Sequence, residues 1–101
     1  MGLLIYGDGS DPVRIDDVLL AHLRVVITTK LRRRESFTLS WQHFDEEAQD
    51  RSTLWLHPAI PLRLVFDDAE PPALDRRLIE ELTVAANSSG GIRLTAADRT
   101  E

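Results

Sequence analysis

The chain of 101 residues contains no cysteine, one lysine and few aromatic residues. Without cysteine it has no disulfide framework and no thiolate site for a metal ion. No apolar run approaches the roughly 18 residues that a membrane-spanning helix needs, so no membrane association is expected. The N-terminal segment also lacks the basic region and the long apolar core of a secretory signal. Together these absences lead us to expect a cytoplasmic location.

The basic residues of the chain are almost all arginine. Arginine outnumbers lysine by 11 to 1, while the formal net charge of the chain is −5. A negative net charge argues against a general nucleic-acid-binding protein. The arginine excess has two interpretations, namely codon bias in a GC-rich genome or selection for guanidinium groups that bind phosphate. Composition leaves both of them open.

The length of the chain predicts a single domain, residues 1–101, with one modest core. Its hydrophobic content of 43% and its charged content of 29% are typical of globular proteins. Residues 97–101 are polar and terminal, and we expect them to be frayed.

Hydrophobic periodicity divides the chain into strands and helices. The predicted strands are 3–6, 13–15, 36–43, 52–57, 62–67 and 91–96. The predicted helices are 18–33 and 76–87. Asp16 or Asp17 is expected to cap the first helix and Asp75 the second. Gly90 or Gly91 is expected to cap the end of the second helix in a left-handed conformation.

The order of these elements is β-β-α-β-β-β-α-β. It predicts an α+β domain of two layers, in which a largely antiparallel sheet carries both helices on one face. The first helix has apolar residues around much of its girth, which indicates burial on more than one side.

The strands 36–43 and 52–57 are expected to form a hairpin around an acidic turn at 44–50. The first strand alternates cleanly, whereas the second has three apolar residues in a row, Leu54, Trp55 and Leu56. A turn at 44–50 gives a definite set of opposed pairs: His43 with Arg51, Trp41 with Thr53, Leu39 with Trp55, and Phe37 with His57. In this register Trp55 faces the core.

The same register places Leu54 and Leu56 on the outer face of the sheet, where Val65 extends them. An apolar patch on an outer face indicates an interface. Leu54, Leu56 and Val65 are therefore the candidate interface of a homodimer. The alternative is that a loop or the N-terminal hairpin covers these side chains within the monomer.

A basic run follows the first helix and supplies candidate phosphate contacts. These are Lys30, Arg32, Arg33 and Arg34. The alternative interpretation is that cations at a helix C-terminus complement the helix dipole and stay solvated.

Tests for catalytic and metal chemistry give no candidate residue. The sequence lacks the G-x-S-x-G motif of a nucleophile elbow. The adjacent pairs Asp16-Asp17 and Asp67-Asp68 suit caps and turns better than acid–base chemistry. In the predicted register His43 and His57 lie roughly 20 Å apart, too far to share a zinc ion. We therefore predict no catalytic residue and no metal site.

Two glycine-containing segments also fail as cofactor motifs. Gly7-Asp8-Gly9 has Pro12 where a dinucleotide fingerprint needs its third glycine. The segment SSGG follows a helix, whereas a phosphate-binding loop precedes one. A turn and a helix end explain them, so no cofactor is expected.

Four segments together resemble a family of small actinobacterial proteins of unknown function: MGLLIYG, AHLRVVITTKLRRRESFTLSW, STLWLHPAIPLR and PPALDRRLIEELTVAANSSGG. The resemblance covers nearly the whole chain. Members often carry the label ATP-dependent DNA ligase. Ligases of that class attach AMP to the lysine of a K-x-D-G motif, whereas Lys30 is followed by Leu-Arg-Arg. We therefore expect no ligase activity from the chain itself.

Three functions follow from these observations. The leading hypothesis is a non-catalytic protein-interaction module that homodimerises. The alternative is a nucleic-acid-associated accessory protein that binds phosphate through its arginines. An enzyme acting on a small molecule is the third, and it needs a concave pocket with convergent polar groups.

Overall fold

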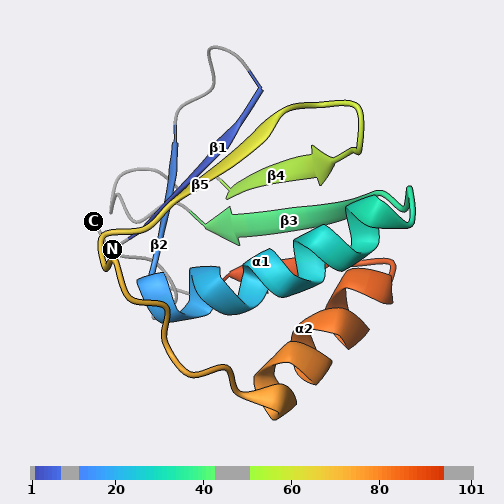
Figure 1. The fold of residues 1–101 in the computed structure, drawn as a ribbon. Coiled ribbons are helices and arrows are strands. Elements are labelled where there is room, and N and C mark those ends of the chain that lie inside the picture. The colour runs from blue at the N-terminus through green and yellow to red at the C-terminus, as the bar shows by residue number, and fades with distance from the viewer. Residues whose placement is uncertain (1, 8–11, 43–50, 95–101) are drawn as a thin grey trace.

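The computed structural model describes residues 2–7, 12–42 and 51–94 of the chain. Its elements follow one another in the predicted order, so the α+β class is confirmed (Figure 1). The strands are β1 (Gly2–Tyr6), β2 (Val13–Ile15), β3 (Phe37–Gln42), β4 (Arg51–Leu56), β5 (Leu62–Val65) and β6 (Ile92–Leu94). The helices are α1 (Asp17–Arg32) and α2 (Arg76–Asn87). The expected turn at 44–50 and the expected tail at 97–101 lie outside the described residues.

Both helices begin at the predicted carboxylates. The side chain of Asp16 accepts the N–H of Leu19 at 3.2 Å, and that of Asp75 accepts the N–H of Arg77 at 3.0 Å. Each carboxylate thereby satisfies a backbone donor that has no partner within its helix. The C-cap of α2 is Ser88 in an extended conformation, so the predicted glycine cap is wrong; Gly91, three residues further on, has the left-handed φ of 67°.

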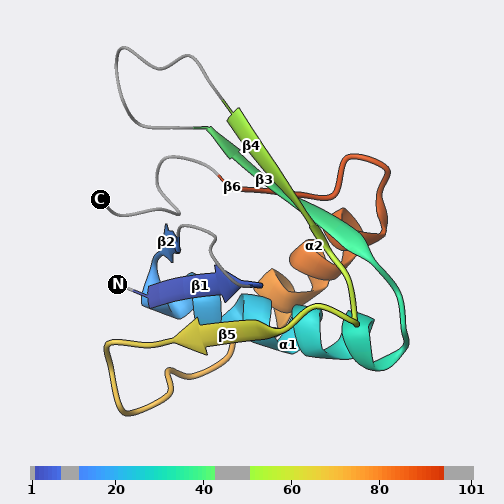
Figure 2. The same ribbon diagram turned by 90° about the horizontal axis from the view of Figure 1, so that it is seen from above.

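The six strands form two sheets, whereas the sequence predicted one. Their orders are β2-β1-β5 and β4-β3-β6. The first sheet is antiparallel throughout, and in the second only β6 runs parallel to its neighbour, β3. Figure 2 shows the strands of the two sheets running at an angle to one another. A strand from the C-terminal half of the chain completes each sheet, so both halves are needed for either one.

Helix α1 packs against α2 and against β1, and α2 in turn contacts β3 and β6 (Figure 1). Leu20, Leu23 and Ile27 belong to the core cluster, while His22 and Lys30 are buried polar residues of the same helix. The prediction that this helix is buried on more than one side is therefore confirmed.

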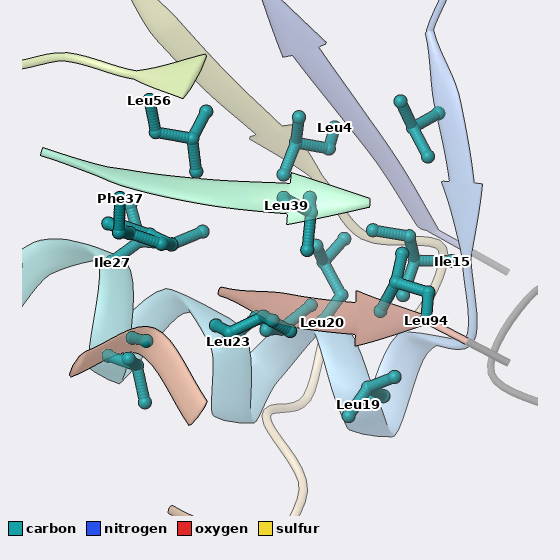
Figure 3. Packing of buried hydrophobic residues seen from close by; sticks show 14 of the residues in the cluster. Leu4, Ile15, Leu19, Leu20, Leu23, Ile27, Phe37, Leu39, Leu56 and Leu94 are labelled. Carbon is teal, nitrogen blue, oxygen red and sulfur yellow. The ribbon is translucent and has the colours of Figure 1, made fainter. Parts of the chain in front are cut away.

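The core joins side chains from both sheets to α1 (Figure 3). The fully buried aliphatic side chains are Leu4, Ile15, Leu20, Leu23, Val26, Leu39, Leu56 and Ile92. Each stabilises the fold by about 1.5–3 kcal/mol relative to an exposed position. Because they come from elements far apart in the sequence, the two sheets share one core.

A buried histidine connects the two helices. His22, which is 1% exposed, contacts the carbonyl oxygen of Val18 through Nδ1 at 2.6 Å and the N–H of Asp75 through Nε2 at 2.8 Å. Since a backbone amide can only donate, Nε2 must accept and Nδ1 must carry the hydrogen. The neutral ring therefore holds the start of α2 against α1, which is a structural role.

Candidate functional site

The register between β3 and β4 decides which side chains point away from the core. Thr38 lies opposite Trp55, and Leu39 lies opposite Leu54. The predicted register differs by one residue and is wrong. Because neighbouring side chains on a strand point to opposite faces, a one-residue shift moves every side chain of β4 to the other face.

The predicted interface patch does not form. Leu56 is 0% exposed, and Leu54 packs against the core cluster on the same face of the sheet. Val65 lies in the other sheet, opposite Leu3. The physical reason is that this register buries Leu56 fully, which is worth about 1.5–3 kcal/mol, and Leu54 in part, at the expense of one tryptophan.

Trp55 is the apolar residue that the register turns outward. Its side chain is 61% exposed, where the sequence predicted a core residue. The indole meets the ring of His57 edge-on, with centroids 5.6 Å apart. A turn follows, in which His57 Nδ1 accepts the N–H of Ala59 at 3.0 Å and the exposed Ile60 donates its N–H to the carbonyl of His57. The tryptophan therefore stands at the end of a strand that leads into a hydrogen-bonded turn.

The outer edge of β4 is capped at one end. The hydroxyl of Tyr6, on β1, donates to the carbonyl of Trp55 at 2.5 Å and accepts the N–H of His57 at 3.1 Å. These backbone groups point away from β3, and those of Thr53 do the same, because alternate residues of a strand face the same edge. No described residue bonds to the N–H or C=O of Thr53, or to the N–H of Trp55, on that side. A short open edge therefore lies beside the exposed tryptophan.

The outer face of the β4-β3-β6 sheet carries a groove of about 570 Å³. Its lining residues are Thr38, Ser40, Trp41, Thr53, Ser89, Gly90, Arg93 and Leu94. Half of them offer hydroxyl groups, and the hydroxyls of Ser40 and Thr53 lie 2.9 Å apart. Of the described residues that line this groove, Arg93 alone is charged. The groove therefore combines hydroxyl groups with one positive charge.

The segment between α2 and β6 shapes one side of the groove. A Cβ at position 90 would lie 3.0 Å from Nη2 of Arg93, so Gly90 leaves room for the guanidinium beside the backbone. A Cβ at position 91 would overlap the hydroxyl and the carbonyl oxygen of Thr38. The two glycines therefore let the chain pass close to β3 and let Arg93 lie along it.

Lys30 does not belong to an exposed basic surface, which corrects its prediction as a phosphate contact. Its side chain is buried, and its ammonium donates to Oε2 of Glu35 at 2.7 Å and to Oδ1 of Asn87 at 2.6 Å. The hydrogen bond and the charge of Lys30 lower the pKa of Glu35. The lysine therefore ties the end of α1 to the end of α2.

Arg32, Arg33 and Arg34 are exposed at the C-terminus of α1. Arg34 has a φ of 60°, and it is the single non-glycine residue with a positive φ in the described parts of the chain. Its N–H donates to Leu31 O at 3.0 Å, and the next N–H donates to Lys30 O at 2.9 Å. This is the Schellman pattern of a helix end, with arginine at the position that glycine usually occupies.

The two acidic pairs act as caps and turns, as the sequence predicted. Beyond the cap at Asp16, the carboxylate of Asp17 accepts the N–H groups of Asp67 and Asp68 at 3.3 and 3.0 Å. The hydrogen bond from the amide of Asp68 is the main cause that lowers the pKa of Asp17, and partial burial opposes it. These carboxylates hold the loop after β5 against the start of α1.

Within the described ranges, no three histidine or acidic side chains come together in a way that would hold a metal ion. In those ranges neither helix is both long and apolar enough to cross a membrane.

Sequence reasoning missed Tyr6, Trp55 and Arg93 as site residues. For Trp55 the sequence did hold an indication: its strand has three consecutive apolar residues, so either face of the strand could be the outer one. Tyr6 and Arg93 had none, because their roles depend on β1 lying beside β4 and on β6 lying beside β3.

Comparison with other proteins identifies a family. The family model of a domain of unknown function, DUF7882, matches residues 1–97. Comparisons with curated proteins and with solved structures found no match. Because the family model spans nearly the whole chain, the protein belongs to the DUF7882 family.

Proposed function

We propose that this protein is a non-catalytic interaction module that forms a homodimer through the open edge of β4. The observation that carries the proposal is the coincidence of an unpaired strand edge with an exposed tryptophan. An exposed edge is a template for a further strand, and aromatic side chains are enriched at protein interfaces. The edge and the indole lie side by side at Trp55.

The β4 edge of a second copy can pair with this edge about a two-fold axis that passes through Thr53. In an antiparallel pair centred there, the two Thr53 residues exchange their N–H···O=C bonds. The N–H of Trp55 then donates to the carbonyl of Arg51 in the second copy. The capped carbonyl of Trp55 ends the pairing, which favours a short, self-complementary partner over a long added strand.

Two matched substitutions test the dimer. Thr53→Lys places two like charges opposite each other across the axis, which opposes pairing, whereas Thr53→Val does not. Both variants lose the hydroxyl contact to Ser40, so the difference between them reports on the edge. We expect light scattering after size exclusion, at about 100 µM protein, to give twice the chain mass of 11.4 kDa for wild type and Thr53→Val, and a monomer for Thr53→Lys. A monomeric wild type, or a dimeric Thr53→Lys variant, contradicts the proposal.

The non-catalytic character extends to the ligase label of the proteins that the chain resembles. Lys30, the only lysine of the chain, is 7% exposed and bonded to Glu35 and Asn87. A lysine that receives AMP must instead present a free amine to the α-phosphate. We expect no covalent adduct after incubation with labelled ATP and Mg²⁺, and an adduct at Lys30 would contradict this part of the proposal. The actinobacterial origin suggested by the resemblance stays a prediction.

A nucleic-acid-associated role is the second candidate. It is favoured by the three consecutive exposed arginines at the end of α1, of which Arg34 keeps a left-handed backbone at an energetic cost. Phosphate contacts of this kind predict binding that weakens steeply with salt.

A pair of charge-matched triple variants tests that role. One replaces Arg32, Arg33 and Arg34 by glutamine. The other replaces Arg24, Arg63 and Arg77, which are exposed arginines outside this run. Anisotropy of labelled single- and double-stranded DNA at about 50 mM salt should fall only for the first variant. Absence of wild-type binding, or equal losses in both variants, argues against the role.

A further inference from the structure

We infer that the groove on the outer face of the β4-β3-β6 sheet binds the phosphate group of a small phosphorylated ligand, with Arg93 as its anchor. The inference rests on the face of the sheet, with Arg93 as its anchor, whereas the proposed homodimer rests on the edge of β4; the two sites share Thr53 and Trp55. The volume of the groove, about 570 Å³, lies within the range of small-molecule sites.

The polar side chains are aligned across three strands. Ser40 of β3 lies opposite Thr53 of β4 on one side and beside Arg93 of β6 on the other. Neighbouring strands are about 4.8 Å apart, so the row spans roughly 10 Å across the sheet. Two hydroxyls in contact at 2.9 Å thus sit next to a guanidinium on one face.

Within the described parts of the chain, the guanidinium of Arg93 is open to a ligand. Among the described residues, none forms a hydrogen bond or an ion pair with the guanidinium of Arg93. Its side chain is exposed, and Gly90 leaves the space in which it lies beside the backbone. A planar fork of N–H donors matches a phosphate oxyanion and pairs with it more strongly than with neutral groups.

The chemistry of the lining selects the ligand class. The described residues of the groove include no carboxylate, so nothing in this set competes for the guanidinium or repels an anion. Thr38, Ser40, Thr53 and Ser89 surround the cation with hydroxyl groups that donate to oxygen. Trp55 is paired with the groove residue Thr38, and its exposed ring offers a stacking surface for a flat group. A phosphate ester that carries a planar group uses all of these features.

The test is a series of titrations followed by amide chemical shifts. The probes are orthophosphate, a nucleoside 5′-monophosphate, the same nucleoside without phosphate, and a thymidine oligonucleotide. We expect saturable shifts at Ser40, Thr53, Gly90 and Arg93, with a Kd of order 1 mM for orthophosphate and tighter for the monophosphate. Chloride at equal ionic strength and the unphosphorylated nucleoside should leave these amides unshifted.

Matched variants establish the anchor. Arg93→Gln should weaken binding of the monophosphate at least about ten-fold, and Arg93→Lys should retain part of it. Arg63→Gln, which removes an exposed arginine from the other sheet, should bind like wild type. Because Arg93 is exposed, these variants should fold, which the unperturbed amides of the core report.

Three results would overturn the inference. The first is the absence of saturable shifts with either phosphate compound. The second is equal affinity of Arg93→Gln and wild type. The third is binding confined to the oligonucleotide, which would assign the groove to a nucleic-acid backbone and not to a small ligand.

Discussion

The two faces of the β4-β3-β6 sheet are built from alternate residues of the same strands and have opposite characters. The inner face presents Phe37, Leu39 and Leu56 to the core, all of them buried. The outer face presents hydroxyl groups, a guanidinium and Trp55, none of which is fully buried. The inner face accounts for the stability of the sheet, which leaves the outer face free to bind.

The two strands differ in how firmly their sequences assign these faces. On β3 polar residues alternate with apolar ones, and only one assignment is possible. On β4 three apolar residues stand in a row, so the sequence allows either face to be the inner one. The observed register resolves this by placing both leucines on the core side, Leu56 fully buried and Leu54 partly buried, and exposing the tryptophan between them.

Truncating one side chain on each face should give the largest difference in the free energy of unfolding. Leu56→Ala removes a fully buried side chain and should lower the free energy of unfolding by about 2–5 kcal/mol. Trp55→Ala removes a larger side chain that is mostly exposed and should cost about 1 kcal/mol or less. Urea denaturation of both variants measures the difference. A Trp55→Ala variant that loses more stability than Leu56→Ala would assign the two faces the other way round.

The two glycines beside the groove, Gly90 and Gly91, give a second test, with a smaller expected loss of stability. Gly91→Ala should destabilise the protein by about 2–3 kcal/mol, because its φ of 67° disfavours a side chain and the new Cβ would overlap Thr38 of β3. Gly90→Ala is the matched control, since its Cβ meets the movable end of Arg93 and should have a much smaller effect. Thermal unfolding of the two variants tests this, and equal losses would contradict the close contact with β3.

The basic run at the end of α1 also contains one buried and one exposed residue that can be compared. Lys30 points inward and is bonded, whereas Arg34 is exposed with a left-handed backbone. Arg34→Gly should therefore raise the free energy of unfolding by about 0.5–1 kcal/mol, because glycine adopts this conformation without the steric cost. Arg33→Gly, at a φ of −86°, should give no such gain. Chemical denaturation at fixed pH checks both, and a destabilised Arg34→Gly variant would show that the arginine side chain itself stabilises the helix end.

The smallest expected effect concerns pH. The amide of Asp68 is the main cause that lowers the pKa of Asp17 in the folded protein. The stability from this lowered pKa is therefore present above the ordinary carboxyl pKa and is lost as pH falls from about 5 to below the folded value. Because the site is solvated, we expect a loss below about 1 kcal/mol. Asp17→Asn should reduce the pH dependence of urea unfolding between pH 7 and pH 3, and an unchanged dependence would contradict the assignment.

Most of the fold was predictable from local patterns. The helix 76–87 and the strand 13–15 were predicted with their observed bounds, because caps and periodicity are properties of neighbouring residues. The division into two sheets was not predictable, since it depends on β1 pairing with β5 and β3 with β6, which are contacts between distant segments.

The site was less predictable than the fold. The predicted patch at Leu54 and Leu56 rested on a strand register that differs from the observed one by a single residue. Nothing local to β4 indicates that the hydroxyl of Tyr6 caps its edge from 49 residues away. Arg93 also looked like an ordinary strand residue until the parallel pairing of β6 placed it beside Ser40. Residues defined by long-range pairing are therefore the ones that sequence reasoning missed.

The most direct test of the account is disulfide trapping across β3 and β4, which is straightforward because the chain contains no cysteine. The structure pairs Thr38 with Trp55. The cap from Tyr6 indicates that this is a non-hydrogen-bonded pair, whose Cα atoms lie about 4.5 Å apart, within the range of a disulfide. The double variant Thr38→Cys with Trp55→Cys should oxidise to an intramolecular disulfide in the folded protein, and Leu39→Cys with Trp55→Cys should not. The opposite outcome would return Trp55 to the core and Leu54 and Leu56 to the surface.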